Sequence, residues 1–154
     1  MELVQHVYSV LAISTREKFY TSLRGLLPEE RYSPLCWESD VTSARRLLLE
    51  RTFDIVVIST PLPDEFGHEL CADAVEKTDA GVIFLAKAAA AEQLLTPLSE
   101  EGVLLVTKPF SNTFFLQAIQ MAAASNHRLL LLRQENQRMQ EKLSLIHISE
   151  PTRP

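Results

Sequence analysis

The stretch Asp54–Ser59, DIVVIS, constrains the fold more than any other part of the chain. Its four central residues are all Ile or Val, and no polar residue interrupts them. A continuous β-branched run of this kind is typical of a strand buried on both faces, which occurs in parallel sheets covered by helices on both sides. The sequence therefore predicts an α/β fold built on a covered parallel sheet.

The rest of the chain alternates short apolar runs with amphipathic stretches. Further strands are predicted at Val7–Ser14, Ser33–Ser39, Gly81–Ala86 and Gly102–Val106. Helices are predicted at Thr15–Leu27, 41–51, 67–78, 89–101 and from about Ser111 onward. Asp40 is the expected N-cap of the second helix. Five strands, each followed by a helix, favour a parallel sheet with right-handed crossovers and the strand order 2-1-3-4-5.

In a sheet of this order, ligands bind in a crevice beyond the carboxyl ends of the strands. The residues expected around that hollow are Ser14, Thr15, Ser59, Ala86, Lys87 and Lys108. They are neutral or basic, so this sheet edge carries no strand-end carboxylate.

Residues 7–124 resemble the receiver domain of a two-component response regulator. The resemblance rests on the βα rhythm, on DIVVISTPLPDEFGHEL from Asp54, and on VTKPF before the last helix. It implies a flavodoxin-like (CheY-like) doubly wound parallel five-stranded sheet, here with an extended C-terminal helix. By this resemblance, the acid pair of receivers falls on Ser14 and Thr15, the phosphoacceptor Asp on Ser59, and the strand-four hydroxyl on Ala86. Only the Lys-Pro pair is kept, as Lys108-Pro109, where a cis peptide is implied.

These departures predict a pseudo-receiver that is not phosphorylated. Phosphoryl transfer to an aspartate needs Mg²⁺, which prefers carboxylate oxygens, whereas Ser14, Thr15 and Ser59 offer only hydroxyls. We therefore expect no catalytic residue, no metal and no cofactor. Lys108 is expected to cap backbone carbonyls or to pair with Asp64 or Glu65. The alternative is that the hollow binds another anion or a partner group.

The final helix continues well beyond the length usual in a receiver. Leucine, asparagine and methionine recur at alternating spacings of three and four, at Leu129, Leu132, Asn136, Met139 and Leu143. This a/d pattern predicts a coiled-coil seam, and an Asn at an a position commonly specifies a parallel pair. We expect a homodimer. The alternative is a single helix that packs back on its own domain.

The linker LLRQENQRMQEKL extends the resemblance to the ANTAR transcription antiterminators, in which a receiver or pseudo-receiver leads through a coiled coil to an RNA-binding domain. The tail LSLIHISEPTRP, residues 143–154, is similar to an in-frame translation of a sequencing adapter and abandons the heptad pattern. The expected division is therefore a pseudo-receiver at 1–124, a coiled-coil extension at 125–142, and a non-native tail. RNA would be reached only through a domain beyond Lys142.

Composition narrows the remaining function classes. The formal charge of −5 argues against a polybasic nucleic-acid or membrane surface on this domain. The two cysteines have no metal-ligand spacing, and no signal peptide is evident, so we expect a cytoplasmic protein with free thiols. The leading hypothesis is a non-catalytic regulatory module with a regulatory protein partner. Two alternatives stay open: a phospho-accepting receiver that feeds a DNA-binding domain, and a small-ligand or anion sensor.

Overall fold

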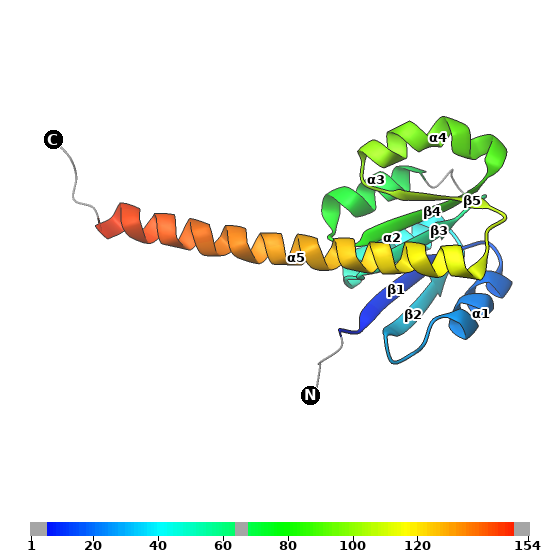
Figure 1. Ribbon diagram of the computed structural model, residues 1–154, viewed down its shortest axis with the longest axis horizontal. Helices are drawn as coiled ribbons and strands as arrows, with labels where there is room; N and C mark the ends of the chain where they lie inside the picture. The colour runs from blue at the N-terminus through cyan, green and yellow to red at the C-terminus, as the bar shows by residue number, and fades with distance from the viewer. Residues whose placement is uncertain (1–5, 64–67, 150–154) are drawn as a thin grey trace.

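The computed structural model describes residues 6–63 and 68–149; within these, it leaves out the side chains of 68, 129, 130, 133 and 140–149. Strands and helices alternate strictly along the chain (Figure 1). The elements are β1 (Tyr8–Ile13), α1 (Glu17–Leu26), β2 (Tyr32–Glu38), α2 (Val41–Glu50), β3 (Ile55–Ser59), α3 (His68–Lys77), β4 (Gly81–Lys87), α4 (Ala88–Glu100), β5 (Leu104–Lys108) and α5 (Asn112–Ser149).

The five strands form one parallel sheet in the order β2-β1-β3-β4-β5. This order confirms the predicted flavodoxin-like fold. Every residue of the central strand β3 is buried, as its β-branched run predicts. Asp40 caps α2 as expected, because its Oδ1 accepts a hydrogen bond of 2.7 Å from the Ser43 backbone N–H.

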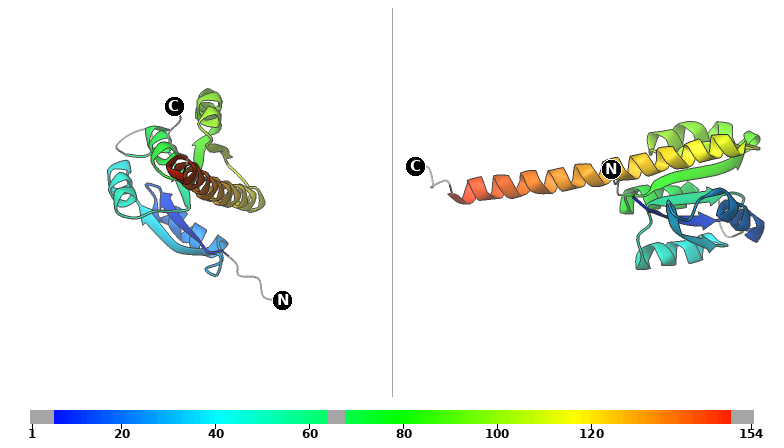
Figure 2. Two further views of the ribbon diagram at one scale, coloured as in Figure 1. Left: turned by 90° about the vertical axis from the view of Figure 1, so that its left-hand side faces the viewer. Right: turned by 60° about the horizontal axis from the view of Figure 1, so that its bottom comes forward.

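Two apolar clusters cover the two faces of the sheet. One packs α1 and α5 against the sheet, with Leu23 and Phe115 among its buried side chains. The other packs α2, α3 and α4 against the opposite face, through residues such as Ala44, Leu70 and Leu98. Figure 2 shows α5 on one side of the sheet and α2 and α3 on the other. The strand-end residues therefore sit between two fully formed layers.

The last strand and the last helix differ from their predicted bounds. β5 begins at Leu104, because Gly102 instead follows the end of α4 with a φ of +85°. A glycine in this left-handed conformation is a common helix terminator. The helix α5 continues to Ser149 and so passes the boundary expected near Lys142. No Gly or Pro occurs in α5 to interrupt it, and the next proline is Pro151.

The two cysteines are both free and lie in different environments. Burial, with a smaller contribution from the charge of Glu101, raises the pKa of the Cys71 thiol. Cys36 is only partly buried. Because the thiolate is the reactive form, iodoacetamide at mildly alkaline pH should label Cys36 in the native protein and Cys71 only after unfolding. Peptide mapping after a timed reaction measures this, and equal labelling of both native thiols would contradict the burial of Cys71.

Candidate functional site

The strand-end residues gather at the carboxyl edge of the sheet, and strand alternation decides which face each one shares. Ser14 and Ser59 continue the face of Ala12 and Val57, which packs against α1 and α5. Lys87 and Lys108 continue the same face after Leu85 and Val106, and they are register partners at the ends of β4 and β5.

Ala86 differs from this group. Its side chain is packed in the cluster under α2, α3 and α4, on the opposite face. It therefore does not line the same hollow as Ser59 and Lys108, contrary to the arrangement expected from sequence. Adjacent residues of a strand point to opposite faces, which explains why Ala86 and Lys87 separate.

The positions of the acid pair carry hydroxyls that are already hydrogen-bonded. Ser14 is buried, and its Oγ accepts a hydrogen bond of 3.2 Å from the Arg16 backbone N–H. Thr15 Oγ1 donates to the Pro61 carbonyl at 2.9 Å. The Trp37 indole N–H donates to the Ser14 carbonyl at 2.9 Å. These contacts link the end of β1 to the neighbouring segments. The two residues that follow β1 carry hydroxyls and no carboxylate.

The phosphoacceptor position is held by a buried residue, Ser59. Ser59 is 6% exposed, and its Oγ makes no hydrogen bond within the part of the chain that the structure describes. The next residue, Thr60, donates through Oγ1 and its backbone N–H to the Leu85 carbonyl, at 2.9 and 3.1 Å. Thr60 thus connects the loop after β3 to β4. The hydroxyl of Ser59 has no hydrogen-bond partner among the described residues.

Lys108 closes the site from the side of β5. Its Nζ donates a 2.6 Å hydrogen bond to the Thr60 carbonyl, which is one of the two roles expected for it. The other, an ion pair with Asp64 or Glu65, lies outside the described residues. Burial lowers the pKa of Lys108, and the charges of Lys87 and Arg16 lower it further. The Lys108-Pro109 peptide is cis, as implied by the resemblance.

These residues do not fit the Mg²⁺ ion that receivers use. Within residues 6–63 and 68–149, no group of three or more His, Cys, Asp or Glu side chains could hold a metal ion. The hydroxyls of Ser14 and Thr15 are engaged, and the charged groups that act on Lys108 are cations. Mg²⁺ favours carboxylate oxygens in near-octahedral geometry, and the described strand-end residues Ser14, Ser59 and Lys108 supply none.

Sequence reasoning missed the part played by Arg16. It occupies the N-cap of α1, as Lys87 occupies the N-cap of α4, and neither side chain caps its helix. Helix N-termini favour Ser, Thr, Asp or Asn and repel cations. Lys87 was expected at this edge, whereas the signal for Arg16 was a basic residue in the short connection between β1 and α1.

The expected dimer seam lies far from this edge, on the free part of α5. Among its members, Leu132, Asn136 and Met139 are exposed, whereas the side chains of Leu129 and Leu143 lie outside those described. Figure 1 shows α5 continuing beyond the amino edge of the sheet, away from the carboxyl ends of the strands. In this single chain the described seam residues do not pack back on the domain.

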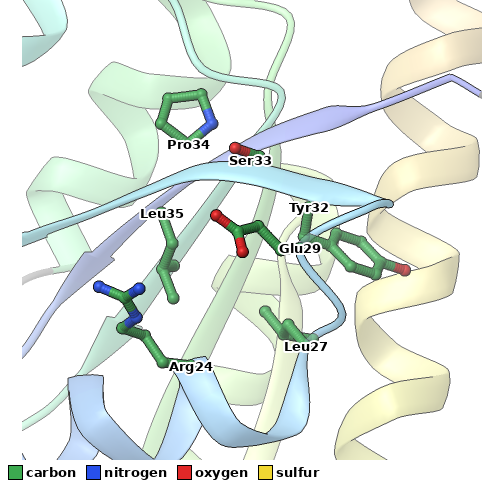
Figure 3. A pocket seen from close by; sticks show the side chains of 7 residues that line it. All are labelled: Arg24, Leu27, Glu29, Tyr32, Ser33, Pro34 and Leu35. Carbon is green, nitrogen blue, oxygen red and sulfur yellow. The ribbon is translucent and has the colours of Figure 1, made fainter.

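A hollow of about 240 Å³ lies between the end of α1 and the edge strand β2 (Figure 3). Arg24 approaches it from α1, Leu27 from the residue that follows α1, and Tyr32 and Leu35 from β2. Burial raises the pKa of Tyr32, with opposing smaller effects from Arg31 and Tyr8. This hollow is at the start of β2, away from the strand ends, and shares no residue with the site above.

No helix in the described part of the chain is long and apolar enough to cross a membrane.

No protein-family model matches the chain. A curated relative, the regulatory protein VanRB of Enterococcus faecalis (strain ATCC 700802 / V583), is 24% identical over 112 residues. The match covers 72% of this chain and 50% of the relative, so the chain spans about half the length of that protein.

Solved structures show the same fold. The non-phosphorylated HemR receiver domain from Leptospira biflexa is 27% identical with a TM-score of 0.65, and the match covers 75% of this chain and 94% of that one. An adenylate cyclase structure from Rhodopirellula baltica has a TM-score of 0.75 at 13% identity, covering 86% and 98%. The second likeness shows the fold alone. The relative and the HemR domain support a receiver domain of the response-regulator type, a class that is regulatory and in general not enzymatic.

Proposed function

We propose that this chain is a phosphorylation-independent pseudo-receiver, a cytoplasmic regulatory module that passes a signal to an output domain through α5. One observation carries the proposal. Hydroxyls occupy the three positions where receivers hold acids, and Lys108 Nζ contacts the Thr60 carbonyl at 2.6 Å. The lysine that would neutralise a phosphoryl group thus already has an internal partner, and no carboxylate at Ser59 can form an acyl-phosphate.

The route to the output follows the chain. Lys108 ends β5, and α5 begins at Asn112, so a change at the hollow acts on the first turn of α5 directly. The helix then crosses the sheet, where it contacts β4 more than any other strand, and continues past the amino edge (Figure 1). A rigid helix anchored along one face can transmit a shift or rotation over its whole length.

We also propose that two copies pair through α5. Among the side chains that the structure describes, five of the eight exposed large hydrophobic residues are on this helix: Phe114, Met121, Leu131, Leu132 and Met139. Phe114 and Leu132 are 18 residues apart, as are Met121 and Met139, a separation of about five full turns. The second pair is offset from the first by seven residues, which is close to two full turns, so these four side chains lie in one stripe along the helix. Exposed apolar stripes mark contact surfaces, and the α5 of a second copy provides one of matching length.

The output domain is proposed to be an RNA-binding antitermination domain of the ANTAR type. Support comes from the resemblance of residues 131–143 to the linker of that family and from the continuous helix that carries them. The coding sequence beyond the Lys142 codon tests this directly. A small helical RNA-binding domain there supports it, and a helix-turn-helix domain contradicts it.

Trp37, the only tryptophan, gives a direct test of the metal-free site. Its indole donates to the Ser14 carbonyl, so its fluorescence reports on the position where receivers bind Mg²⁺. We expect a titration with MgCl₂ to leave the Trp37 emission unchanged, once NaCl of equal ionic strength has been subtracted. A saturable Mg²⁺-dependent change would show that carboxylates assemble here and would contradict the proposal.

A further inference from the structure

Two helices begin at the carboxyl edge of the sheet with a basic residue at the N-cap. Arg16 precedes the ten-residue α1, and Lys87 precedes the thirteen-residue α4. Neither makes a side-chain cap, whereas α2 is capped at its own start by Asp40. The free N–H groups of a helix N-terminus favour an anion. A cationic side chain there is unfavourable unless an anion lies between it and the helix N–H groups.

Lys108 adds a third cation to the same place. It is register partner to Lys87, and the charges of Lys87 and Arg16 both act on it. Its hydrogen bond to Thr60 uses one of three ammonium protons, so the same ammonium group can also donate to a ligand. Arg16 and Lys87 make no ion pair with any described carboxylate, and this includes Glu17 in the first turn of α1.

Ser59 is an independent observation that points to a ligand. It is more than nine-tenths buried, and its hydroxyl makes no hydrogen bond in the described part of the chain. By strand alternation it lies on the same face as Lys87 and Lys108. An unpartnered hydroxyl on the same face as two lysines is suited to donate a hydrogen bond to an oxyanion.

We propose that the carboxyl edge binds a tetrahedral oxyanion, as free phosphate or as a phosphomonoester, without covalent attachment. Arg16, Lys87 and Lys108 supply the positive charge, and Ser59 supplies a hydroxyl donor. The proposal rests on the proposed function, because it gives the emptied phosphorylation site a non-covalent ligand. It concerns a local concentration of cations in a chain whose formal net charge is −5.

The first measurement is a thermal-shift titration of the full chain with inorganic phosphate and, separately, with methyl phosphate. Sodium chloride at equal ionic strength is the reference in both series. A ligand that binds the folded state raises the melting temperature with the logarithm of its concentration above its dissociation constant. We expect a shift of this logarithmic form from at least one of the two probes and none from chloride. No shift from either probe would overturn the proposal.

A charge-matched pair of double variants separates a site from a general effect of charge. Arg16→Ala with Lys87→Ala removes two exposed cations at the hollow, and we expect the phosphate shift to disappear. Arg46→Ala with Lys77→Ala removes two exposed cations on α2 and α3 and should leave the shift intact. Equal shifts in both double variants would show that phosphate binds elsewhere, which would overturn the assignment.

Ser59→Ala tests the hydroxyl separately. Losing one hydrogen bond is expected to weaken phosphate binding about three- to tenfold. Because the hydroxyl has no hydrogen-bond partner among the described residues, the melting temperature in chloride should change little, which shows that the variant is folded. Unchanged phosphate affinity in this folded variant would remove Ser59 from the site.

Intact mass after the titration distinguishes this proposal from the proposed function. Non-covalent binding leaves the mass unchanged, whereas a covalent phosphoryl group would contradict the pseudo-receiver itself. Absence of any phosphate shift, with the mass also unchanged, would overturn the anion site and leave the pseudo-receiver standing.

Discussion

Gly81→Ala is expected to lower the free energy of unfolding by about 3 kcal/mol, the upper part of the range for overpacking a well-filled core. A Cβ built on Gly81 would lie 2.3 Å from the Ala122 carbonyl oxygen of α5. This contact is backbone against backbone, so no side chain can rotate to relieve it. The helix would have to move away from β4, against which it packs.

The buried Asn126 makes that movement more costly. Its Nδ2 donates to the Asp79 carbonyl at 2.8 Å. Asn126 is one helical turn after Ala122, and Asp79 is two residues before Gly81. Moving α5 would stretch this contact as well. The point where α5 leaves the domain is therefore clamped, which the transmission of a signal along α5 requires.

Gly25→Ala is the matched control for this prediction. Gly25 is inside α1, and nothing lies within 4 Å of a Cβ built on it. Alanine there should stabilise the protein by roughly 0.5–1 kcal/mol, because glycine is unfavourable within a helix. Chemical denaturation of both variants measures the two opposite signs. A neutral Gly81→Ala would show that α5 does not approach β4 as closely as described.

Leu132→Asp is expected to raise the dimer dissociation constant by at least about a hundredfold, since a carboxylate would be buried without a partner in the seam. Leu132 lies on the stripe with Phe114 and is 53% exposed in the single chain. Replacing it therefore changes little in the monomer, and the effect belongs to the pair. Sedimentation equilibrium over a range of micromolar concentrations measures the constant.

Leu131→Asp is an unusually close control for Leu132→Asp. Leu131 is the preceding residue and is equally exposed at 51%, but a helix rotates by about 100° per residue, which takes it off the stripe. It should leave the dimer nearly unchanged. Asn136→Leu should tighten association while weakening the preference for two parallel strands. A wild-type chain that is monomeric at these concentrations would contradict the seam.

The fold could be predicted because its strongest signals are local and periodic. The β-branched run of Asp54–Ser59 identifies a doubly covered strand, and Asp40 marks a helix start by its own hydrogen-bonding chemistry. The end of α4 was harder. An apolar stretch after Gly102 looks like a strand from its first residue, and only the positive φ assigns that glycine to the helix terminus.

The place of the site could be predicted from sequence, but which side chains share it could not be predicted in full. Strand order places every strand end at one edge, so the hollow follows from topology. Which side chains share a face depends on register and alternation at the last residues of each strand. Ala86 and Lys87 were both expected on one side, but Ala86 packs on the opposite face. The hydrogen bond from Lys108 to Thr60 depends on a loop conformation that composition does not encode.

The central claim is that Ser59 and its neighbours have lost phosphoryl chemistry. Incubation of the full chain with acetyl phosphate and Mg²⁺, followed by intact mass measurement, tests it most directly, with a receiver that keeps its acids treated in parallel as the positive control. The account predicts that the control gains a phosphoryl group and that this chain keeps its unmodified mass. A stable added phosphoryl group on this chain, at Ser59 or at any other residue of the carboxyl edge, would contradict it.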